Sequence, residues 1–332
     1  MADLILNEPI LVTGCAGFIG FHTARRLLTE GYQVIGYDNL NDYYDQTLKQ
    51  DRLHLLTTNP SFHFVKGSLE NIELLQHLFT TYKPKIVLHL AAQAGVRYSI
   101  ENPHAYVQSN ITGFMHLIEC CQLFNVQHLL YASSSSVYGG NDKIPFCTTD
   151  RVDQPISVYA ATKRSNELFA YTYSHLHHLR ATGLRFFTVY GPWGRPDMAL
   201  YTFANSILKD EPISLYNNGK MERDFTYIDD VVESIYRLMK KGHLQTRNTL
   251  HEIHNIGSNS PVQIEYIVQL IERELNKKAH KRYTPIQPGD VKRTYANLQT
   301  LIQAIQYQPT TSIEEGVRHF ITWYKQYHNI LD

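Results

Sequence analysis

The first half of the chain alternates short apolar runs with stretches of helical periodicity, and this rhythm restricts the fold more than any other feature. The run Pro9–Thr13 predicts a buried strand, and a helical pattern follows it as far as Gly31. Strands that alternate with helices form a parallel sheet with helices on both faces. We therefore predict an α/β fold around a doubly wound parallel sheet. The further strands expected in this half are Gln33–Tyr37, Phe62–Val65, Ile86–Leu90, His128–Ala132 and Thr182–Phe187.

After about residue 190 the alternation loosens. Prolines and glycines recur between 191 and 219 and predict a loop-rich region. Regular patterns return with a helix at Ile228–Lys241, a strand at His251–Ile256 and a helix at Val262–Asn276. We expect the strand at His251–Ile256 to rejoin the main sheet.

We interpret this layout as two lobes built from interleaved segments. The expected nucleotide-binding lobe comprises residues 1–189 with a return segment at about 228–258, and a smaller C-terminal substrate lobe comprises residues 190–227 and 259–332. Ligands of doubly wound sheets bind beyond the carboxyl ends of the strands. The cleft between the two lobes is therefore the expected site.

The charge balance narrows the class of ligand. Lys and Arg total 31 and Asp and Glu total 31, so the formal net charge is zero with the 17 His neutral. Nucleic-acid scaffolds and polybasic membrane binders need a basic excess to neutralise phosphates. We therefore expect neither a nucleic-acid nor a membrane partner, although a locally basic pocket can still hold a small anion.

The chain also lacks the signals of export and membrane insertion. The segment Met1–Ile10 has neither the basic start nor the apolar core of a signal peptide, and the chain has no apolar run of about 18 residues. The four cysteines form no CxxC pair, which predicts neither a disulfide framework nor a zinc site. A reduced, cytoplasmic setting without a bound metal is the expectation.

Three glycines follow the first predicted strand. Gly14, Gly17 and Gly20 have the spacing GxxGxxG, a variant of the dinucleotide-binding fingerprint of Rossmann folds. Such glycines permit a tight turn, backbone approach to a pyrophosphate and close helix–strand packing, while the helix N-terminus faces the phosphates. Asp38, at the end of the second strand, can accept hydrogen bonds from ribose hydroxyls and repels a 2′-phosphate, which favours NAD over NADP. A purely structural turn is the alternative.

A second motif follows the fifth predicted strand. Tyr159 and Lys163 are four residues apart on a predicted helix and share one face. An ammonium group beside a phenol lowers the pKa of the tyrosine, which makes it a general base for a sugar hydroxyl. Ser134 lies in a serine run at the carboxyl end of the preceding strand, where its hydroxyl can bond the reacting oxygen. Each part alone has a structural alternative, a common helical pair or a polar turn, but the combination with the glycine turn favours catalysis.

Longer motifs surround these residues. Three of them are TGCAGFIG, SSSSVYG and YAATK, and they resemble the nucleotide-sugar epimerases and dehydratases of the extended short-chain dehydrogenase/reductase superfamily. Six further segments, spread over the whole chain, are DNLNDYYD (38–45), AAQAGVRYSIENPHAYVQSN (91–110), RFFTVYGPWGRPDMAL (185–200), GKMERDFTYIDD (219–230), QPGDV (287–291) and TSIEEGV (311–317). Together these segments resemble the UDP-glucuronate 4-epimerase family.

This resemblance implies the reaction. UDP-glucuronate and UDP-galacturonate would be interconverted through a transient 4-keto sugar, with NAD as a tightly held cofactor. The resemblance implies Tyr159 as the base that takes the O4 proton, Lys163 as its tuner and nicotinamide-ribose contact, and Ser134 as the hydroxyl nearest O4. Ser135 and Ser136 are expected close behind. The expected use of the product is the supply of surface polysaccharides.

The resemblance also implies contacts for the rest of the substrate. Arg223 is similar to the arginine that holds the UDP diphosphate, and Asp290 is similar to the acid on the uridine ribose. Thr188 and Arg195 are expected near the glucuronate carboxylate, since a guanidinium fork suits a carboxylate. For Arg195 a phosphate contact or a surface ion pair is the alternative. Arg97 is expected to face phosphate or to bridge the lobes.

Cofactor contacts follow from the same resemblance, with one departure. Relatives usually carry an adenine-binding acid after the third strand, but Ser68 stands there, and its hydroxyl is expected to reach the adenine amine. The residues expected to contact NAD are Gly14, Gly17, Phe18, Ile19, Gly20, Asp38, Asn39, Ser68, Leu69, Leu90, Ala91, Ala92, Tyr159 and Lys163.

Residues that are missing distinguish this chain from related enzymes. A related dehydratase would carry an Asp–Glu pair at Ser135 and Ser136, and a related decarboxylase that makes UDP-xylose would carry an acid at Ser136. No carboxylate stands there, which favours an epimerase. Two alternatives stay open. One is a 4-epimerase of neutral UDP-hexoses such as UDP-glucose or UDP-N-acetylglucosamine, where Arg195 has no carboxylate to bind, and the other is a non-catalytic NAD-binding sensor.

Two long helical patterns are candidates for assembly. They are Pro103–Leu123 and Val158–Leu176. In the family that the chain resembles, such helices pair across a two-fold axis as a four-helix bundle, so a homodimer is expected. The alternative is that the apolar faces of both helices lie entirely within the core of one chain.

Overall fold

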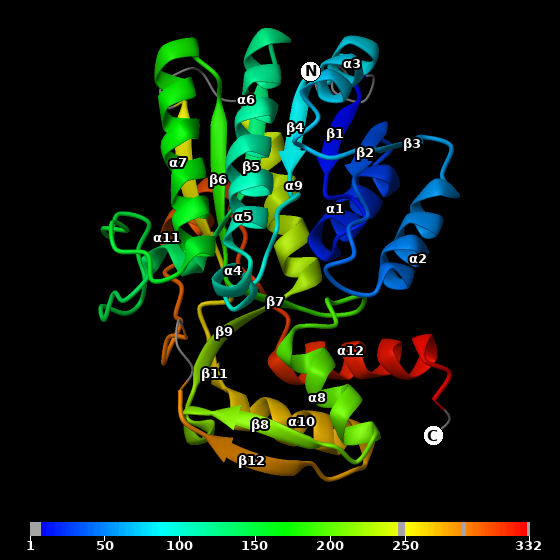
Figure 1. Cartoon of the computed structure of the whole chain (residues 1–332), viewed down its shortest axis with the longest axis vertical. Helices are drawn as coiled ribbons and strands as arrows, with labels where there is room; N and C mark the ends of the chain where they lie inside the picture. The colour runs from blue at the N-terminus through cyan, green and yellow to red at the C-terminus, as the bar shows by residue number, and fades with distance from the viewer. Residues whose placement is uncertain (1–7, 245–249, 287–289, 331–332) are drawn as a thin grey trace.

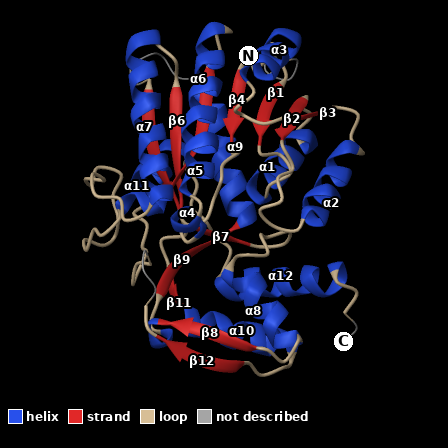
Figure 2. Ribbon diagram, in the orientation of Figure 1, coloured by secondary structure: helices blue, strands red, loops and turns tan. Residues whose placement is uncertain are grey.

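The structure is a computed structural model that describes residues 8–244, 250–286 and 290–330 (Figure 1). Residues 1–7 lie outside these ranges, and they are most of the segment from which we expect no signal peptide. The start of the QPGDV motif, at 287–289, also lies outside them. Figure 2 shows an upper part in which a sheet lies between layers of helices, and a smaller lower part with short strands and helices.

The upper part is built on a seven-stranded sheet in the order β10-β6-β5-β4-β1-β2-β3, and all neighbouring strands are parallel. This is the strand order of doubly wound dinucleotide-binding folds, extended by β10. The prediction of a Rossmann-type sheet is confirmed. The strands are β1 (Ile10–Thr13), β2 (Val34–Asp38), β3 (Phe62–Lys66), β4 (Ile86–His89), β5 (His128–Ser134), β6 (Ala181–Phe186) and β10 (His251–Ile256).

Alternate side chains of each strand face the two helix layers. On β1, Ile10 and Val12 belong to one buried cluster, and Leu11 belongs to the other. Burial on both faces explains why the strands are nearly continuous apolar runs in the sequence. One layer holds α1 (Phe18–Thr29), α2 (Gln46–Thr57), α9 (Ile228–Leu244) and α11 (Gln299–Ile305), and the other holds α3 (Ile72–Tyr82), α6 (Gly113–Leu123) and α7 (Val158–His177).

The long helix expected at 103–123 is present, with an internal change of winding. The short helices α4 (Tyr98–Glu101) and α5 (Pro103–Tyr106) precede a π-helical segment at Val107–Thr112, which continues into α6. Such segments occur frequently at functional sites. This one carries the buried Asn110, whose side chain bonds the backbone of the loop after β4.

The lower part contains two small sheets and three of the described helices. One sheet has the order β11-β9-β7, and the other is a parallel pair of β12 and β8. These strands and helices are β7 (Thr188–Tyr190), α8 (Ala199–Leu208), β8 (Pro212–Tyr216), β9 (Glu222–Tyr227), β11 (Pro261–Gln263), α10 (Ile264–Leu275), β12 (His280–Thr284) and α12 (Ile313–Tyr327).

The lower part differs from the sequence-based expectations in three respects. The region 191–219 is not mainly loop, because α8 and β8 lie within it. The helix expected from Val262 begins at Ile264, since the preceding residues pair with β9 as β11. Helix α11 packs on α9 and β10 of the large sheet through Leu301 and Ile305, although the sequence pattern assigns all of 259–332 to the smaller lobe.

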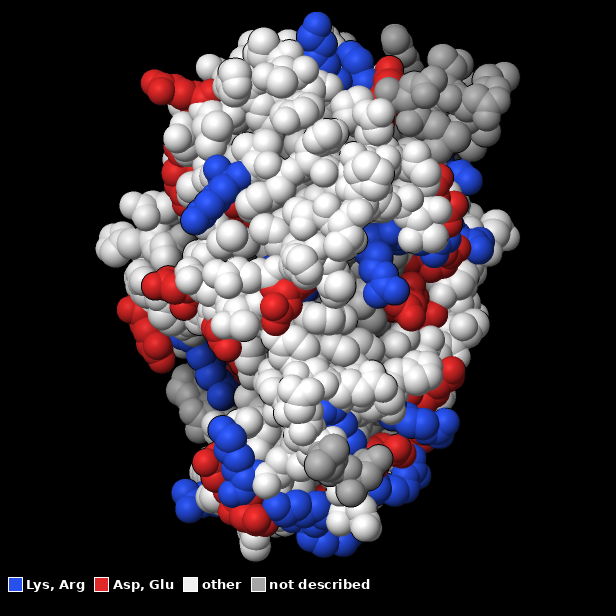
Figure 3. Space-filling model, turned by 90° about the vertical axis from the view of Figure 1, so that its right-hand side faces the viewer, with Lys and Arg blue, Asp and Glu red and all other residues white. Residues whose placement is uncertain are grey.

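The outer surface carries charges of both signs. Figure 3 shows Lys and Arg side chains interspersed with Asp and Glu side chains over one face of the molecule. This distribution agrees with the zero net charge and gives that face no broad field of one sign. Among the helices of the described residues, none combines the length and the apolar character that crossing a bilayer requires.

Candidate active site

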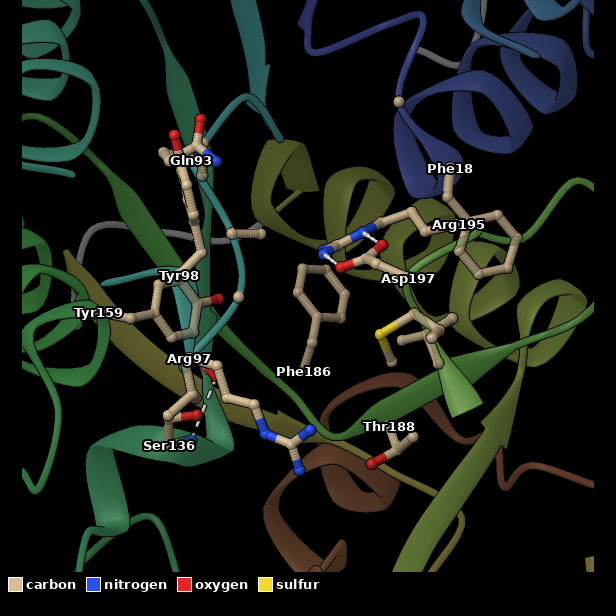
Figure 4. Close-up of a pocket in the computed structure, with 18 of the residues that line it drawn as sticks. Phe18, Gln93, Arg97, Tyr98, Ser136, Tyr159, Phe186, Thr188, Arg195 and Asp197 are labelled. Atoms are coloured by element: carbon tan, nitrogen blue, oxygen red, sulfur yellow. Dashed lines mark hydrogen bonds and ion pairs between the residues drawn. The ribbon is translucent and has the colours of Figure 1, made fainter. Parts of the chain in front are cut away.

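A cleft of about 990 Å³ lies between the large sheet and the smaller sheets. Its floor is formed by segments that follow the carboxyl ends of the parallel strands, where doubly wound folds bind their ligands. Its wall includes every residue that the sequence predicts for cofactor or substrate, apart from Ser68. Figure 4 shows Tyr159 and Arg195 on opposite sides of this pocket.

The glycine turn between β1 and α1 forms the cofactor side of the cleft. Gly14 has φ +72°, and a Cβ there would lie 2.6 Å from the Ala91 amide nitrogen. A Cβ on Gly20 would lie 2.0 Å from the Gly14 carbonyl oxygen, and one on Gly17 would lie 3.0 Å from the same atom. These distances leave no room for side chains at Gly14 and Gly20, so the backbone itself forms this wall.

Helix α1 starts at this turn without a side-chain cap. Gly17 is the N-cap residue, and the first turn contains no acidic residue. An uncapped helix N-terminus is a ready site for a diphosphate. Asp38 accepts hydrogen bonds from the Ala16 amide at 3.0 Å and the Leu40 amide at 2.8 Å, which hold its carboxylate on the pocket wall. This cradle fits NAD, the cofactor predicted from the sequence.

Ser68 does not take the place predicted for it. Its hydroxyl donates to the Glu70 carboxylate, and its carbonyl accepts from Tyr37 Oη at 2.7 Å. Its neighbours Gly67 and Leu69 line the cleft, whereas Ser68 does not. The hydroxyl expected near the adenine is therefore engaged by a carboxylate two residues along the chain.

Ser134, Tyr159 and Lys163 come together at the end of β5. Ser134 is the last residue of that strand, and α7 carries the other two residues one turn apart. The Ser134 side chain shares a hydrogen bond with the Tyr159 phenol. Lys163 Nζ donates to the Ala132 carbonyl at 2.9 Å. Ser157 caps α7 by accepting from a first-turn amide, which fixes the start of the helix directly before Tyr159.

Burial and neighbouring groups shift the pKa values of Tyr159 and Lys163. Burial lowers the pKa of Lys163 to about 7. Burial also raises the pKa of Tyr159 above its usual value, while the Ser134 hydrogen bond and the positive charge of Arg195 lower it. The positive charge of Arg195 thus favours a phenolate at Tyr159, and the ammonium group of Lys163, one turn further along α7, is itself desolvated.

A buried ion pair supports the end of β5 from behind. Glu167, one turn after Lys163 on α7, accepts from Ser133 Oγ at 2.7 Å and from Arg185 Nε at 2.8 Å. Arg185 Nη2 donates to the other carboxylate oxygen at 2.9 Å. Two-point contacts of this kind are geometrically specific. The pair therefore fixes Ser133, and with it the backbone next to Ser134.

Three more hydroxyl side chains line the cleft. Ser135 and Ser136 begin a 3-10 turn after β5, and the Ser136 amide donates to Ser134 Oγ at 3.1 Å. Thr188 begins β7 on the wall contributed by the lower part. Figure 4 shows Ser136 and Thr188 at the same end of the pocket. The wall is therefore lined by neutral hydroxyl groups at these three positions, and no carboxylate stands at 135 or 136.

Arg195 reaches the cleft already paired with a carboxylate. Its Nε donates to Asp197 Oδ1 at 3.0 Å and its Nη2 donates to Oδ2, a two-point contact (Figure 4). Tyr43 Oη donates to the same carboxylate at 3.2 Å, and burial raises the pKa of Tyr43 to about 12. The sequence motifs single out neither Asp197 nor Tyr43. The two-residue spacing of Arg195 and Asp197 on one loop is the signal that indicates their pairing.

A second cationic group lies elsewhere on the wall. Arg97 Nη2 donates to Asp290 Oδ2 at 3.0 Å, and its guanidinium carbon lies 4.4 Å from the centre of the Tyr216 ring. Arg97 thus bridges the loop after β4 and the lower part. Arg223, on β9, donates to the Glu222 carbonyl at 2.9 Å, and burial lowers its pKa. Within the described residues these two guanidinium groups share one carboxylate on the wall, so the group is cationic overall.

The sequence motifs also miss a basic residue on the cofactor side. Lys49, on α2, is buried, and its Nζ donates to the Asn41 carbonyl at 2.6 Å. Burial lowers the pKa of Lys49 to about 8, while the nearby Asp38 raises it. No sequence signal marks this residue, because a lysine within a polar helical pattern is typical of an exposed helix face.

The chain matches known proteins over nearly its whole length. Residues 11–320 match the family model described as GDP-mannose 4,6 dehydratase. Protein CapI of Staphylococcus aureus is 52% identical over 331 residues, which cover 96% of this chain and 99% of that protein. A probable UDP-glucuronate 4-epimerase of Rhizobium meliloti (strain 1021) is 45% identical over 329 residues, which cover 95% of this chain and 96% of that protein.

Solved structures agree with these matches. The UDP-glucuronic acid 4-epimerase from Bacillus cereus, in complex with UDP-glucuronic acid and NAD, has a TM-score of 0.89 at 34% identity, over 96% of this chain and 100% of that one. A variant of that enzyme with a tyrosine replaced by phenylalanine, in complex with UDP-4-deoxy-4-fluoro-glucuronic acid and NAD, has a TM-score of 0.88 at 33% identity over the same shares. The chain therefore belongs to the GDP-mannose 4,6-dehydratase family and, within it, to the UDP-glucuronate 4-epimerases that its motifs resemble.

Proposed function

We propose that this protein is an NAD-dependent 4-epimerase that interconverts UDP-glucuronate and UDP-galacturonate through a transient 4-keto sugar. The observation that carries the proposal is the meeting of Tyr159, Lys163 and Ser134 beside the glycine turn, with serines in place of carboxylates at 135 and 136. In this proposal the large sheet holds the cofactor and the smaller sheets hold the sugar nucleotide.

Tyr159 is the residue that moves the proton. When bound, NAD supplies the group that accepts the hydride from C4 and returns it. The positive charge of its nicotinamide ring also favours a phenolate at Tyr159. Tyr159 takes the proton from the sugar O4 and returns it after inversion. Ser134 holds the phenol through their hydrogen bond, and the Arg195 charge favours its deprotonated form.

Inversion at C4 requires the 4-keto sugar to present its other face. The sugar turns about its bond to the diphosphate, so the diphosphate and the uridine must stay in place while it moves. Arg223 and Arg97 hold the diphosphate end by charge-assisted hydrogen bonds, and Asp290 holds the uridine ribose. The cleft of about 990 Å³ spans both the glycine turn and the sugar side, so one cavity holds the cofactor and the sugar nucleotide next to each other.

The carboxylate of the substrate needs separate control. A 4-keto uronate is a β-keto acid and loses carbon dioxide readily, so return of hydrogen to C4 must outpace this loss. Ser135, Ser136 and Thr188 hold the carboxylate by neutral donors. Arg195 also lies near the substrate carboxylate, and Asp197 partly neutralises the positive charge of this arginine. The expected product is therefore the epimer and not a pentose.

Parallel incubations with UDP-glucuronate and UDP-glucose, followed by separation of the products, test the proposal. UDP-galacturonate without a UDP-pentose is the expected result, and a UDP-pentose as the main product would contradict it. One observation favours the neutral-hexose alternative, because Asp197 already occupies the fork of Arg195. Turnover of UDP-glucose at least as fast as that of UDP-glucuronate would establish this alternative. A non-catalytic sensor would convert neither sugar.

We also propose that two copies of the chain pair through α6 and α7. Large apolar side chains on these helices are exposed, among them Leu123 at 57%, Leu168 at 51% and Tyr171 at 60%. Leu168 and Tyr171 are three residues apart and share one side of α7. Pairing the same face of two copies would remove this surface from water and form a four-helix bundle.

Sedimentation of the purified protein tests this pairing. The wild type is expected to be a dimer at micromolar concentration, and a variant with both Leu168→Glu and Tyr171→Glu is expected to be a monomer with an unchanged circular dichroism spectrum. Leu55→Glu, at an exposed position on α2, is the matched control and should leave the dimer intact. A monomeric wild type would contradict the proposal.

A further inference from the structure

Arg52, on α2, is a fully buried charge that the proposed mechanism does not use. Its exposed fraction is 0%. Among residues 8–244, 250–286 and 290–330, no carboxylate lies within ion-pair distance of it, and its hydrogen-bond acceptors are all uncharged. Arginine is rarely buried without an ionic partner, because removing its charge from water is costly. The free-energy cost of burying the Arg52 charge suggests that this residue has a function.

The guanidinium group of Arg52 joins three segments of the chain. Its Nη1 donates to the Ala16 carbonyl at 2.9 Å and to Tyr44 Oη at 2.8 Å. Its Nη2 donates to the Trp193 carbonyl at 2.6 Å and to the Gly194 carbonyl at 3.3 Å. One edge of the planar group therefore holds the glycine turn, and the other edge holds the loop between β7 and α8.

The two loops that Arg52 joins carry the two halves of the site. Ala16 stands between Gly14 and Gly17 in the cofactor cradle. Gly194 directly precedes Arg195, which lies on the sugar wall. The planar guanidinium group of Arg52 therefore links the position of one loop to that of the other. Arginine suits this task because its donors are fixed in a plane, whereas a lysine offers one ammonium group.

His22 provides a second link between the same two loops. It lies on α1 just after the glycine turn, and its Nε2 donates to the Pro192 carbonyl at 2.9 Å. Burial lowers the pKa of His22 to about 3, so the ring is neutral and its one proton is on the nitrogen that faces the carbonyl. The neighbouring Phe21 ring lies 5.6 Å from the Trp193 ring. The loop of the sugar wall is thus tied to the start of α1 as well as to α2.

We infer that Arg52 is a positioning residue that couples the two halves of the site. A ligand that orders one loop reduces the cost of ordering the other, so each ligand raises the affinity for its partner. By linkage the factor is the same in both directions. The inference rests on the proposed function, which supplies NAD and UDP-glucuronate as the two ligands.

Equilibrium dialysis of the full-length chain tests this coupling. The dissociation constant for NAD is measured alone, with UDP and with UDP-glucuronate. In the wild type UDP-glucuronate should raise the NAD affinity about fivefold or more, a usual size for such coupling. UDP should raise it less, because it has no sugar to reach Arg195. In Arg52→Lys, which keeps the charge but cannot hold both loops, the increase should fall below about twofold.

The controls separate coupling from folding and from the proposed function. Arg25→Lys, at an exposed position on α1, should behave as the wild type. If thermal unfolding shows that Arg52→Lys is not folded, His22→Ala removes the second link and should also give a smaller increase. The inference would be overturned if bound UDP-glucuronate left the NAD affinity of the wild type unchanged. It would also be overturned if Arg52→Lys, or a folded His22→Ala variant, kept the full increase in NAD affinity. Failure of the proposed function looks different, because UDP-glucuronate would then be neither bound nor epimerised.

Discussion

The two walls of the cleft are made in different ways. At the glycine turn the cofactor wall is backbone, because Gly14 and Gly20 bring main-chain atoms to distances that exclude a Cβ, and because the first turn of α1 has no side-chain cap. The sugar wall consists of side chains from separate elements, such as Tyr159 from α7, Arg223 from β9 and Arg195 from a loop. A substitution in the backbone wall causes a steric clash with main-chain atoms, so it destabilises the fold as well as the site. A substitution in the side-chain wall removes one contact with the ligand and leaves the fold unchanged.

Tyr159→Phe tests the sugar wall and has the largest expected effect. Removal of one general acid–base group lowers the rate by about 10²- to 10⁴-fold. The phenyl ring keeps the packing, so the thermal unfolding temperature and the NAD content of the purified protein should not change. Tyr173→Phe, at a position on the same helix outside the cleft wall, is the matched control for kcat. Near-normal activity of Tyr159→Phe would show that another group is the base.

Gly20→Ala tests the cofactor wall. The added Cβ would lie 2.0 Å from the Gly14 carbonyl oxygen, so the turn must open. We expect a loss of about 3 kcal/mol of stability in urea unfolding, together with loss of NAD. Gly140→Ala is the control, since no heavy atom lies within 4 Å of its added Cβ. If Gly20→Ala keeps its NAD and its stability, the distinction between the two walls is wrong.

Arg223→Leu removes one contact from the sugar wall. A hydrogen bond to a charged group contributes about 1.5–3 kcal/mol, so the Kd for UDP should rise about 10- to 100-fold. Affinity for NAD should stay the same. Arg293→Leu is the control, because Arg293 pairs with Glu222 outside the cleft wall. Calorimetric titration of both variants with UDP measures the difference, and equal losses would place the diphosphate elsewhere.

Lys163→Met tests the electrostatics where the two walls meet. The pKa of Lys163 is about 7 in the folded chain and 10.5 in the reference state, so the unfolded chain binds more protons between these values. The wild type therefore gains stability as pH rises through this window. The stability of Lys163→Met relative to the wild type should fall by about 1.4 kcal/mol for each pH unit from 7 upward. Urea unfolding of cofactor-free protein at pH 7 and 9 measures this, and a pH-independent difference would contradict the burial of the charge.

The residues of both walls could be predicted from the sequence, but the motifs of the cofactor wall have the simpler physical basis. Gly14, Gly17, Gly20 and Asp38 act through local backbone geometry, which short motifs determine, and all four lie on the wall as predicted. The parallel sheet itself follows in the same way from the alternation of buried runs and helical patterns. Ser68 is the exception on this side, because its hydroxyl binds Glu70 nearby and that preference is not visible in a motif.

The electrostatics of the sugar wall depend on which side chains meet after folding. The sequence identifies Arg195 and Lys163 but leaves open how their charges are compensated. The structure pairs Arg195 with Asp197, and it buries Lys163 without a carboxylate partner within the described residues. Arg52 has no motif at all, because its acceptors are mostly backbone carbonyls of distant segments. Such groups become visible only when the tertiary contacts are known.

Epimerisation followed by NMR in deuterated water tests the central claim most directly. UDP-glucuronate should give UDP-galacturonate that carries ordinary hydrogen at C4, because the hydrogen leaves and returns within the closed cleft while only the O4 proton passes through Tyr159. No UDP-pentose should accumulate. Deuterium at C4 of the product, or a pentose as the main product, would contradict a 4-epimerase that works through a held 4-keto uronate.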